Sequence, residues 1–421
     1  MKTKNLLLAT ALILGTSLMF TSCSKDKGNN EDPIPVAPVT PSATYTLSGN
    51  ITSNMTLTKD QVWYLDGRVI VQSPTELTIE AGTVIKGKEG QDASASVLII
   101  APGAKIHATG TSSEPIVFTS ELDNITPGNV MTSNLSTETN NLWGGVIILG
   151  NAPISAGTGG TLADVEGIPA GTASYGGSNP SDNSGEFQYC SIRHGGVVIG
   201  NNNEINGLTL GGVGTGTQID HVEIVGNVDD GIEFFGGSVN LTDVVIIYQG
   251  DDGIDIDQSY SGSVTNYAIF IGANTQGDAH EIDGPEDSGV NATGLFTLDK
   301  GYVVGNSGNS AKFAVLKSEA QGTLKNCFFT NFPSTAVIQV RGQVEYDNYI
   351  GTGAQPLNIT GNVFNTTSLT GLFSSTIADY SAGTTKFETD GLNSTGAVAT
   401  NGFDATQFAG WSWASSTGLL N

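Results

Sequence analysis

The residues best suited to chemistry are acids that recur in successive segments near the middle of the chain. Glu233, Asp255 and Glu281 stand in the segments Ile-Glu-Phe, Ile-Asp-Ile and His-Glu-Ile. Alternate side chains of a β-strand point to opposite faces, so neighbours that face a core leave each acid facing outward. If the segments stack, the three carboxylates form one row on the outside, which we call the acidic row, with about 4.8 Å between strands.

Carboxylates at that spacing repel one another, so either some of them hold protons or a cation lies between them. Several hard oxygen ligands suit Ca²⁺, and the sequence therefore predicts Glu233, Asp255 and Glu281 as metal ligands. Four further acids extend the row or precede it by one turn and are predicted to bind ligand: Asp230, Asp252, Asp257 and Asp283. The alternative is a solvated acidic face, in which the Asp-Asp-Gly pairs cap turns through their side chains.

Catalysis at this row would need a base, and the chain contains no Lys or Arg from His194 to Asp299. Lys317 falls one coil after Glu281, where it can act as the base or neutralise the end of the row by a salt bridge. Arg193 and His194 precede the row and could close its other end. The sequence contains no Ser/His/Asp set, phosphate loop or thiolate metal site, and its four histidines are scattered.

A repeat positions these acids. Gly207, Gly231 and Gly253 recur at steps of 24 and 22 residues, and a second apolar series behind them has the same period. Strand segments that repeat every 20 to 30 residues indicate a stacked solenoid. We therefore expect an all-β fold of roughly a dozen coils, about 22–25 residues each, between residues of about 60 and 370. One inward column is predicted to contain the pairs Leu208/Leu210, Ile232/Phe234 and Ile254/Ile256.

Other segments are expected to cap or decorate the solenoid. Residues 44–57 are predicted to cover its first coil and residues 402–413 to form a C-terminal cap, although Trp411 and Trp413 also suit a carbohydrate-stacking platform. Residues 123–141 and 155–185 are predicted to be side loops, which often line a binding groove. Cys190 and Cys327 occupy inward positions several coils apart, so we expect two free, buried thiols.

Composition supports one long domain with a cation as its companion. The 421 residues include 56 glycines, and 41 acids against 16 lysines and arginines give a formal charge of -25. This balance disfavours nucleic acid as a partner, because phosphate binding needs the opposite sign. We divide the chain into residues 1–22 as a signal peptide, residues 23–43 as an extended tether, and residues 44–421 as a single solenoid domain.

The N-terminus resembles a bacterial lipoprotein signal. A basic start is followed by an apolar stretch from Leu6 to Phe20, which is too short for a comfortable membrane span, and then by Ser22 and Cys23. The resemblance implies lipidation at Cys23, and Ser24 favours an outer-membrane anchor. The charged residues that follow resemble the export tags of surface-exposed lipoproteins. An ordinary signal peptide with an incidental cysteine is the alternative.

The repeated Asp-Asp-Gly-Ile segments at 229 and 251 resemble right-handed parallel β-helix proteins of the pectate-lyase-like superfamily. Trp143-Gly-Gly, Arg193-His-Gly-Gly and His280-Glu-Ile-Asp-Gly-Pro-Glu resemble a group of bacterial surface lipoproteins with this fold and no settled activity. The resemblance covers residues 45–421 and implies a right-handed parallel β-helix. Polysaccharide lyases of the superfamily hold Ca²⁺ on stacked acids, where it neutralises a uronate while an Arg or Lys abstracts a proton.

Three classes of function follow from these observations. The first is a surface-anchored protein that binds a glycan or another envelope component, and the second is a Ca²⁺-assisted polysaccharide lyase or related glycan-cleaving enzyme. The third is a structural or adhesive lipoprotein. We favour binding over catalysis, because a groove rich in acids with few aromatics and distant bases is poorly equipped for β-elimination. The oligomeric state stays open.

Overall fold

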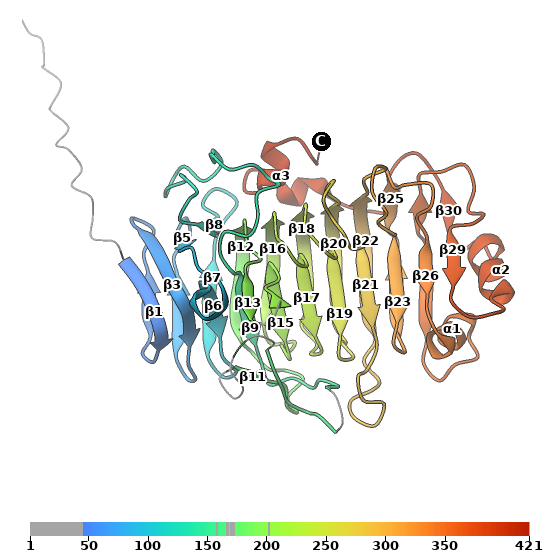
Figure 1. The fold of residues 1–421 in the computed structure, drawn as a ribbon, viewed down its shortest axis with the longest axis horizontal. Coiled ribbons are helices and arrows are strands. Elements are labelled where there is room, and N and C mark those ends of the chain that lie inside the picture. Colours follow the sequence, from blue (N-terminus) through green and yellow to red (C-terminus); the bar gives the residue numbers. More distant parts are fainter. Residues whose placement is uncertain (1–44, 157–158, 166–167, 169–172, 201–202, 421) are drawn as a thin grey trace, which may run out of the picture. The chain divides into compact units, whose positions relative to one another are not determined.

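The computed structural model describes residues 45–420 apart from 157–158, 166–167, 169–172 and 201–202. The predicted signal peptide, Cys23 and the tether lie outside the described residues. In the remainder, parallel strands stack into a long solenoid (Figure 1), the right-handed parallel β-helix that the sequence predicts. No helix among the described residues is long and apolar enough to cross a membrane.

The strands form three parallel ladders that run the length of the solenoid. The first ladder consists of β2 (Met55–Leu57), β4 (Glu76–Ile79), β7 (Lys105–Thr109), β12 (Gly185–Arg193), β16 (Gln218–Val225), β18 (Leu241–Ile247), β20 (Ser263–Phe270), β22 (Phe296–Val304), β24 (Gly322–Lys325) and β27 (Leu357–Thr360). The second reuses the later halves of β12 to β22 and adds β1 (Tyr45–Ile51), β3 (Val62–Val71), β5 (Val84–Gly87), β8 (Ile116–Ser120), β25 (Phe328–Thr330), β28 (Val363–Phe364) and β30 (Ser394–Thr395).

The third ladder carries the acids. It starts with the later halves of β1 and β3 and continues through β6 (Val97–Ile100), β9 (Val146–Leu149), β15 (Leu208–Gly211), β17 (Ile232–Phe235), β19 (Ile254–Asp257), β21 (His280–Asp283), β23 (Ala314–Lys317), β26 (Ile338–Val340) and β29 (Phe373–Ser375). The coil length departs from the prediction after β21: Glu281 pairs with Val315, 34 residues later, because a side loop follows β21.

Residues in the left-handed region make the corner between the first and second ladders. Tyr189, His221, Asp243 and Asn266 all have positive φ, and each is skipped in the register between its strand and the next. Such a φ is uncommon for a residue with a side chain, and asparagine and aspartate adopt it more readily than most. One residue per coil in this conformation bends β12 to β20 so that each strand serves two ladders.

A continuous apolar core fills the interior, and the predicted inward column is confirmed. Leu208, Ile232 and Ile254 pair in register, as do Leu210, Phe234 and Ile256 at the next inward position. All six side chains are buried. Among the described residues, the two cysteines are free and buried, as expected.

The ends of the solenoid are covered by different elements. β1 and β2 form the first rung, consistent with the expected N-terminal cap. At the other end, α1 (Gln343–Ile350) and α2 (Ser381–Thr389) pack together (Figure 1), and Phe387 of α2 contacts Phe364 and Phe373 of the last rungs. The helix α2 therefore shields apolar surface that an open last coil would expose to water.

Residues 401–420, which we call the C-terminal strap, are not the end cap that the sequence predicts. They run back along the outside of the second ladder and include η2 (Ala405–Phe408) and α3 (Trp413–Ser416), which lies over the middle strands (Figure 1). Trp411 is 0% exposed and packs in a cluster with Val245 and Ala268. Both tryptophans are buried against protein, so the expectation of a carbohydrate platform is also wrong.

Polar contacts hold the strap along several coils. The backbone N–H of Ala414 donates to Glu223 Oε1 at 2.9 Å, and that of Asp404 donates to Asn266 Oδ1 at 2.6 Å. Asn401 Nδ2 donates to the backbone oxygens of Gly301 and Asn326. The strap thus touches β16, β20, β22 and the turn after β24.

Trp411→Ala tests the docking of the strap. Removing a fully buried tryptophan leaves a cavity, and we expect the free energy of unfolding to fall by about 3–5 kcal/mol. Urea denaturation followed by circular dichroism measures this change, and Trp411→Phe serves as the milder control. A Trp411→Ala variant as stable as wild type would show that the strap does not pack on the ladder in solution.

Candidate acidic binding site

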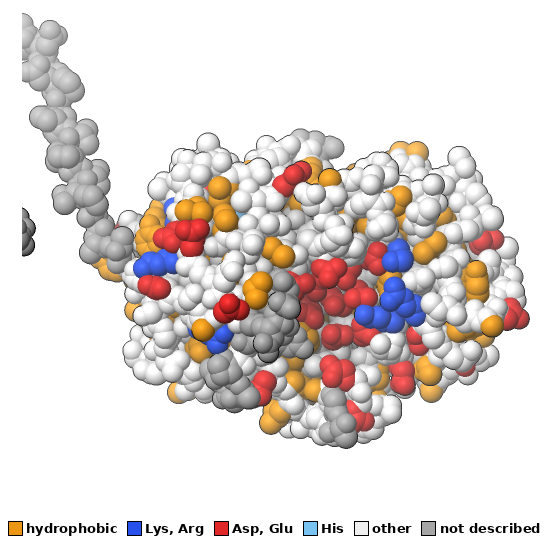
Figure 2. Space-filling view, in the orientation of Figure 1, with side chains coloured by type: hydrophobic (Ala, Val, Ile, Leu, Met, Phe, Trp, Pro, Cys, Tyr) orange, Lys and Arg blue, Asp and Glu red, His pale blue; other side chains and the backbone are white. Residues whose placement is uncertain are grey.

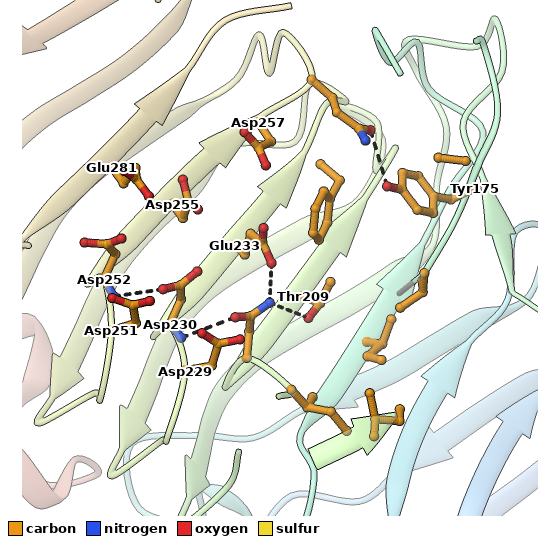
Figure 3. A pocket seen from close by; sticks show the side chains of 18 of the residues that line it. Tyr175, Thr209, Asp229, Asp230, Glu233, Asp251, Asp252, Asp255, Asp257 and Glu281 are labelled. Carbon is orange, nitrogen blue, oxygen red and sulfur yellow. Dashed lines mark hydrogen bonds between the residues drawn. The ribbon is translucent and has the colours of Figure 1, made fainter. Parts of the chain in front are cut away.

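The acidic row forms as predicted on the outer face of the third ladder. Glu233 pairs in register with Asp255, and Asp255 pairs with Glu281, so the three carboxylates occupy one position in consecutive coils (Figure 3). Thr209 precedes them and Val315 follows them in the same column. The inward residues on either side of each acid are buried, which forces the acid to the outside.

Asp257 and Asp283 extend the row by one position along the strands. Carboxylate oxygens of Asp255, Asp257 and Asp283 come within 4.8 Å of one another. Asp283 pairs in register with Lys317, where the next acid of the column would stand. Lys317 Nζ lies 2.8 Å from Glu281 Oε1 and 3.2 Å from Asp283 Oδ2, so this lysine forms the salt bridge that neutralises the end of the row.

These contacts make Lys317 a poor general base. Partial burial lowers the pKa of its ammonium group, but the hydrogen bond to Glu281 and the charges of Asp283 and Glu281 outweigh that effect and raise the pKa. A base must be deprotonated at the operating pH, and this lysine stays protonated.

A second acidic column lies one turn before the row and bonds to the backbone. Asp230 Oδ1 accepts the backbone N–H of Asp252 at 2.8 Å, and Asp252 Oδ1 accepts that of Asp278 in the next coil. Asn206 begins this series and Lys312 ends it, with its Nζ 3.1 Å from Asp278 Oδ2. Asp230 and Asp252 are each 5% exposed. The second acid of each Asp-Asp-Gly segment therefore ties successive turns together, as the capping alternative predicts.

Several groups of three carboxylates are arranged so that they could hold a metal ion. Within each group, one oxygen of each residue lies within 4.8 Å of the others. The groups are Asp229, Asp230 and Asp251; Asp230, Glu233 and Asp255; Asp252, Asp255 and Glu281; and Asp255, Asp257 and Asp283. Asp255 belongs to three of the four groups. Its Oδ1 atom is buried without a hydrogen-bond partner, so an oxygen in the middle of the row has no donor from the protein.

A cavity of about 520 Å³ opens over the row. Acids of β17, β19, β21 and the preceding turns form one wall, where Figure 2 shows a dense acidic patch beside a basic one. The opposite wall is mostly apolar and comes from β9, the outward side of β17 and the hairpin of β10 (Ala163–Asp164) and β11 (Ser174–Tyr175). Its main side chains are Ile147, Val165, Tyr175, Ile199, Ile205 and Phe235.

The expected side loop at residues 155–185 thus lines the cavity, as its place in the sequence suggested. Tyr175 is buried, and its hydroxyl lies 3.3 Å from Gln258 Oε1, while Gln258 Nε2 donates to Glu286. Its ring lies 5.9 Å from that of Phe235. Sequence reasoning did not single out Tyr175 or Phe235. Phe235 follows the inward Phe234, so strand alternation alone places it outward, beside the acids.

Arg193 and His194 do not close the row, and this expectation is wrong. Both are 0% exposed at the end of β12 in the second ladder, away from the third ladder that carries the acids. The Arg193 guanidinium donates to Val130 O and Ser191 Oγ and lies 5.0 Å above the Trp413 ring, beneath the C-terminal strap. His194 Nδ1 contacts Thr139 O at 2.7 Å.

A family model described as a pectate-lyase like beta helix domain matches residues 49–130 and 128–415. The chain belongs to this pectate-lyase-like β-helix family. No curated protein and no solved structure matches the chain significantly.

Electrostatics of this pectate-lyase-like β-helix favour proton uptake by the acids. Desolvation raises the pKa of Asp255, Glu233 and Asp230 well above the usual range, and the charges of neighbouring carboxylates add to the effect. Burial and then the charge of Glu281 raise the pKa of Asp252 to about 8. Burial and the charge of Asp283 raise the pKa of Asp257 to about 7. Without a cation the cluster therefore retains protons near neutral pH.

The raised pKa values predict that stability falls as pH rises from about 7.5 to about 8.5 in the presence of EDTA, since unfolded carboxyls titrate near about 4. The folded state then holds protons that the unfolded state has released. This window lies above the usual histidine range, so the buried His194 and His280, whose pKa values burial lowers to about 4, are neutral in both states.

Thermal melting across this pH range measures the slope. Asp252→Asn is expected to flatten it, and Asp66→Asn, at an exposed site on β3, to leave it unchanged. A wild type whose melting temperature is constant or rises over this range would contradict the shifted pKa values.

Proposed function

We propose that this chain is a surface-exposed lipoprotein, anchored to the outer membrane through Cys23, that binds a glycan or another extracellular ligand in the acidic cavity with Ca²⁺. One observation carries the binding role: a cavity of about 520 Å³ lies directly over a row of stacked carboxylates. Ligand pockets commonly have this size. The anchor and its location rest on the N-terminal signal alone.

Glu233, Asp255 and Glu281 would hold the Ca²⁺, since all are carboxylates and the ion prefers oxygen ligands. Asp257 and Asp283 adjoin Asp255 within ligand distance of a shared ion. A bound ion would offset the repulsion between the acids and present a positive charge to ligand oxygens. Asp230 and Asp252 would support the ion through the oxygens that do not accept a backbone N–H.

A Ca²⁺-assisted lyase is the second candidate, favoured by the stacked acids and the family. It needs a base near the ligand, and Lys317 is committed to Glu281 and Asp283. Incubation with uronate polysaccharides, followed by ultraviolet absorbance of unsaturated products, separates the two. Product formation would favour the lyase. A protein that binds no ligand would favour a structural or adhesive role.

Calcium is expected to stabilise the full-length protein purified in detergent. By mass action the gain is about 2.7 kcal/mol at about a hundred times the dissociation constant. Differential scanning calorimetry in EDTA and in excess CaCl₂ measures it. The gain should disappear in Asp255→Asn and persist in Asp66→Asn. A wild type indifferent to Ca²⁺, with Asp255→Asn at least as stable, would show that the row is a solvated face.

Cys23→Ser tests the anchor. Without the thiol no diacylglycerol can be attached, and the protein is expected to leave the membrane fraction for the soluble one. Fractionation with an antibody against the β-helix provides the measurement, with Cys190→Ser as the matched cysteine control. Retention of Cys23→Ser in the outer membrane would contradict the lipoprotein assignment.

A further inference from the structure

The cavity has two unlike walls, and a bare metal ion uses only one of them. The acidic wall consists of the row and the turns before it, while the apolar wall is built from aliphatic side chains and the rings of Tyr175 and Phe235. None of the residues that line the cavity is Lys, Arg or His. An ion surrounded by carboxylates and water gains nothing from an apolar wall, so this wall indicates an organic ligand.

The volume of the cavity supports the same conclusion. A water molecule occupies about 30 Å³ in the liquid, so a cavity of about 520 Å³ is far larger than one ion and its remaining water ligands need. The apolar side chains would otherwise face water across the acids. A carbon body that fills this space would remove apolar surface from water on the side opposite the charges.

The donor side of the site is also specific. Asp255 Oδ1 is buried and has no hydrogen-bond partner, although it lies in the middle of the acidic wall. A buried carboxylate oxygen without a donor is costly, and a ligand that donates to it relieves that cost. A primary ammonium group carries three donors and a positive charge, and can contact carboxylates of adjacent coils about 4.8 Å apart.

We propose that the ligand of this cavity carries primary ammonium groups on an organic body, as polyamines and free amino sugars do. The inference rests on the proposed binding function and names the class of ligand. The ammonium groups would lie along Glu233, Asp255 and Glu281, and the carbon body would lie against Phe235 and the β10–β11 hairpin. A cation held beside an aromatic ring gains further attraction from the ring face.

An anionic ligand fits this cavity less well unless metal ions intervene. The nearest lysines at the end of the row, Lys312 and Lys317, are paired with Asp278, Glu281 and Asp283. Within the described residues the acidic wall has no countercharge of its own beyond these pairs. An ammonium ligand supplies that countercharge directly.

Isothermal titration calorimetry on the full-length protein tests the inference with defined probes in EDTA. Spermidine represents the polyamines, a glucosamine tetramer represents the free amino sugars, and an N-acetylglucosamine tetramer is the neutral control. We expect one or both amines to bind and the acetylated tetramer to bind at least about tenfold more weakly, because acetylation removes the charge. Binding of spermidine alone assigns a polyamine, and binding of the glucosamine tetramer alone assigns an amino sugar.

Variants separate binding in the cavity from general attraction to an acidic protein. Asp255→Asn is expected to weaken amine binding about tenfold, and Asp66→Asn to leave it unchanged. Phe235→Leu should weaken amine binding about threefold without changing Ca²⁺ affinity, since only an organic cation uses the ring. Tyr175→Phe keeps the ring and should bind amines as wild type does.

Three results would overturn the inference: no amine binding, equal binding of the acetylated tetramer, or equal loss of affinity in Asp255→Asn and Asp66→Asn. Calcium binding without amine binding would reject the ammonium ligand and leave the proposed function standing. Binding of neither calcium nor amines, nor of any glycan, would reject the proposed function as well.

Discussion

The structure depends on one geometric constraint, the in-register stacking of parallel strands. Each position of a coil lies directly over the equivalent position of the next, about 4.8 Å away. A side chain is therefore repeated as a column along the solenoid. Apolar columns gain from this arrangement, because every inward residue is covered above and below. Columns of like charge accumulate repulsion, which the molecule must relieve at every coil.

The third ladder relieves that repulsion in different ways at neighbouring positions. Asp230, Asp252 and Asp278 each accept the backbone N–H of the next coil or turn, so the backbone stabilises these carboxylates. At the end of the row, Lys317 replaces the next acid and pairs with two of them. Asp255, in the middle, has neither a backbone donor nor a lysine, and it retains an oxygen without a partner. The site is the part of the column where internal compensation is absent.

The repeat made much of this arrangement predictable from sequence. Strand alternation and a regular step place Glu233, Asp255 and Glu281 on one face, because both rules are local and additive along a solenoid. The same rules do not say which ladder a strand joins, and for that reason Arg193 was assigned to the row although it lies in the second ladder. The apolar wall of the cavity and the strap depend on contacts between residues far apart in the chain. No periodic pattern encodes those contacts.

The C-terminal strap also bears on the order in which the chain can fold. Coils of a solenoid contact only their neighbours, so they can form locally and in sequence. The strap instead joins Ala414 to Glu223, 191 residues earlier, and contacts later coils on its way. Contacts of such long sequence separation form slowly, and these can form only after the middle coils exist. The last residues to be synthesised therefore complete the docking surface of the middle coils and make local fraying there cooperative with release of the strap.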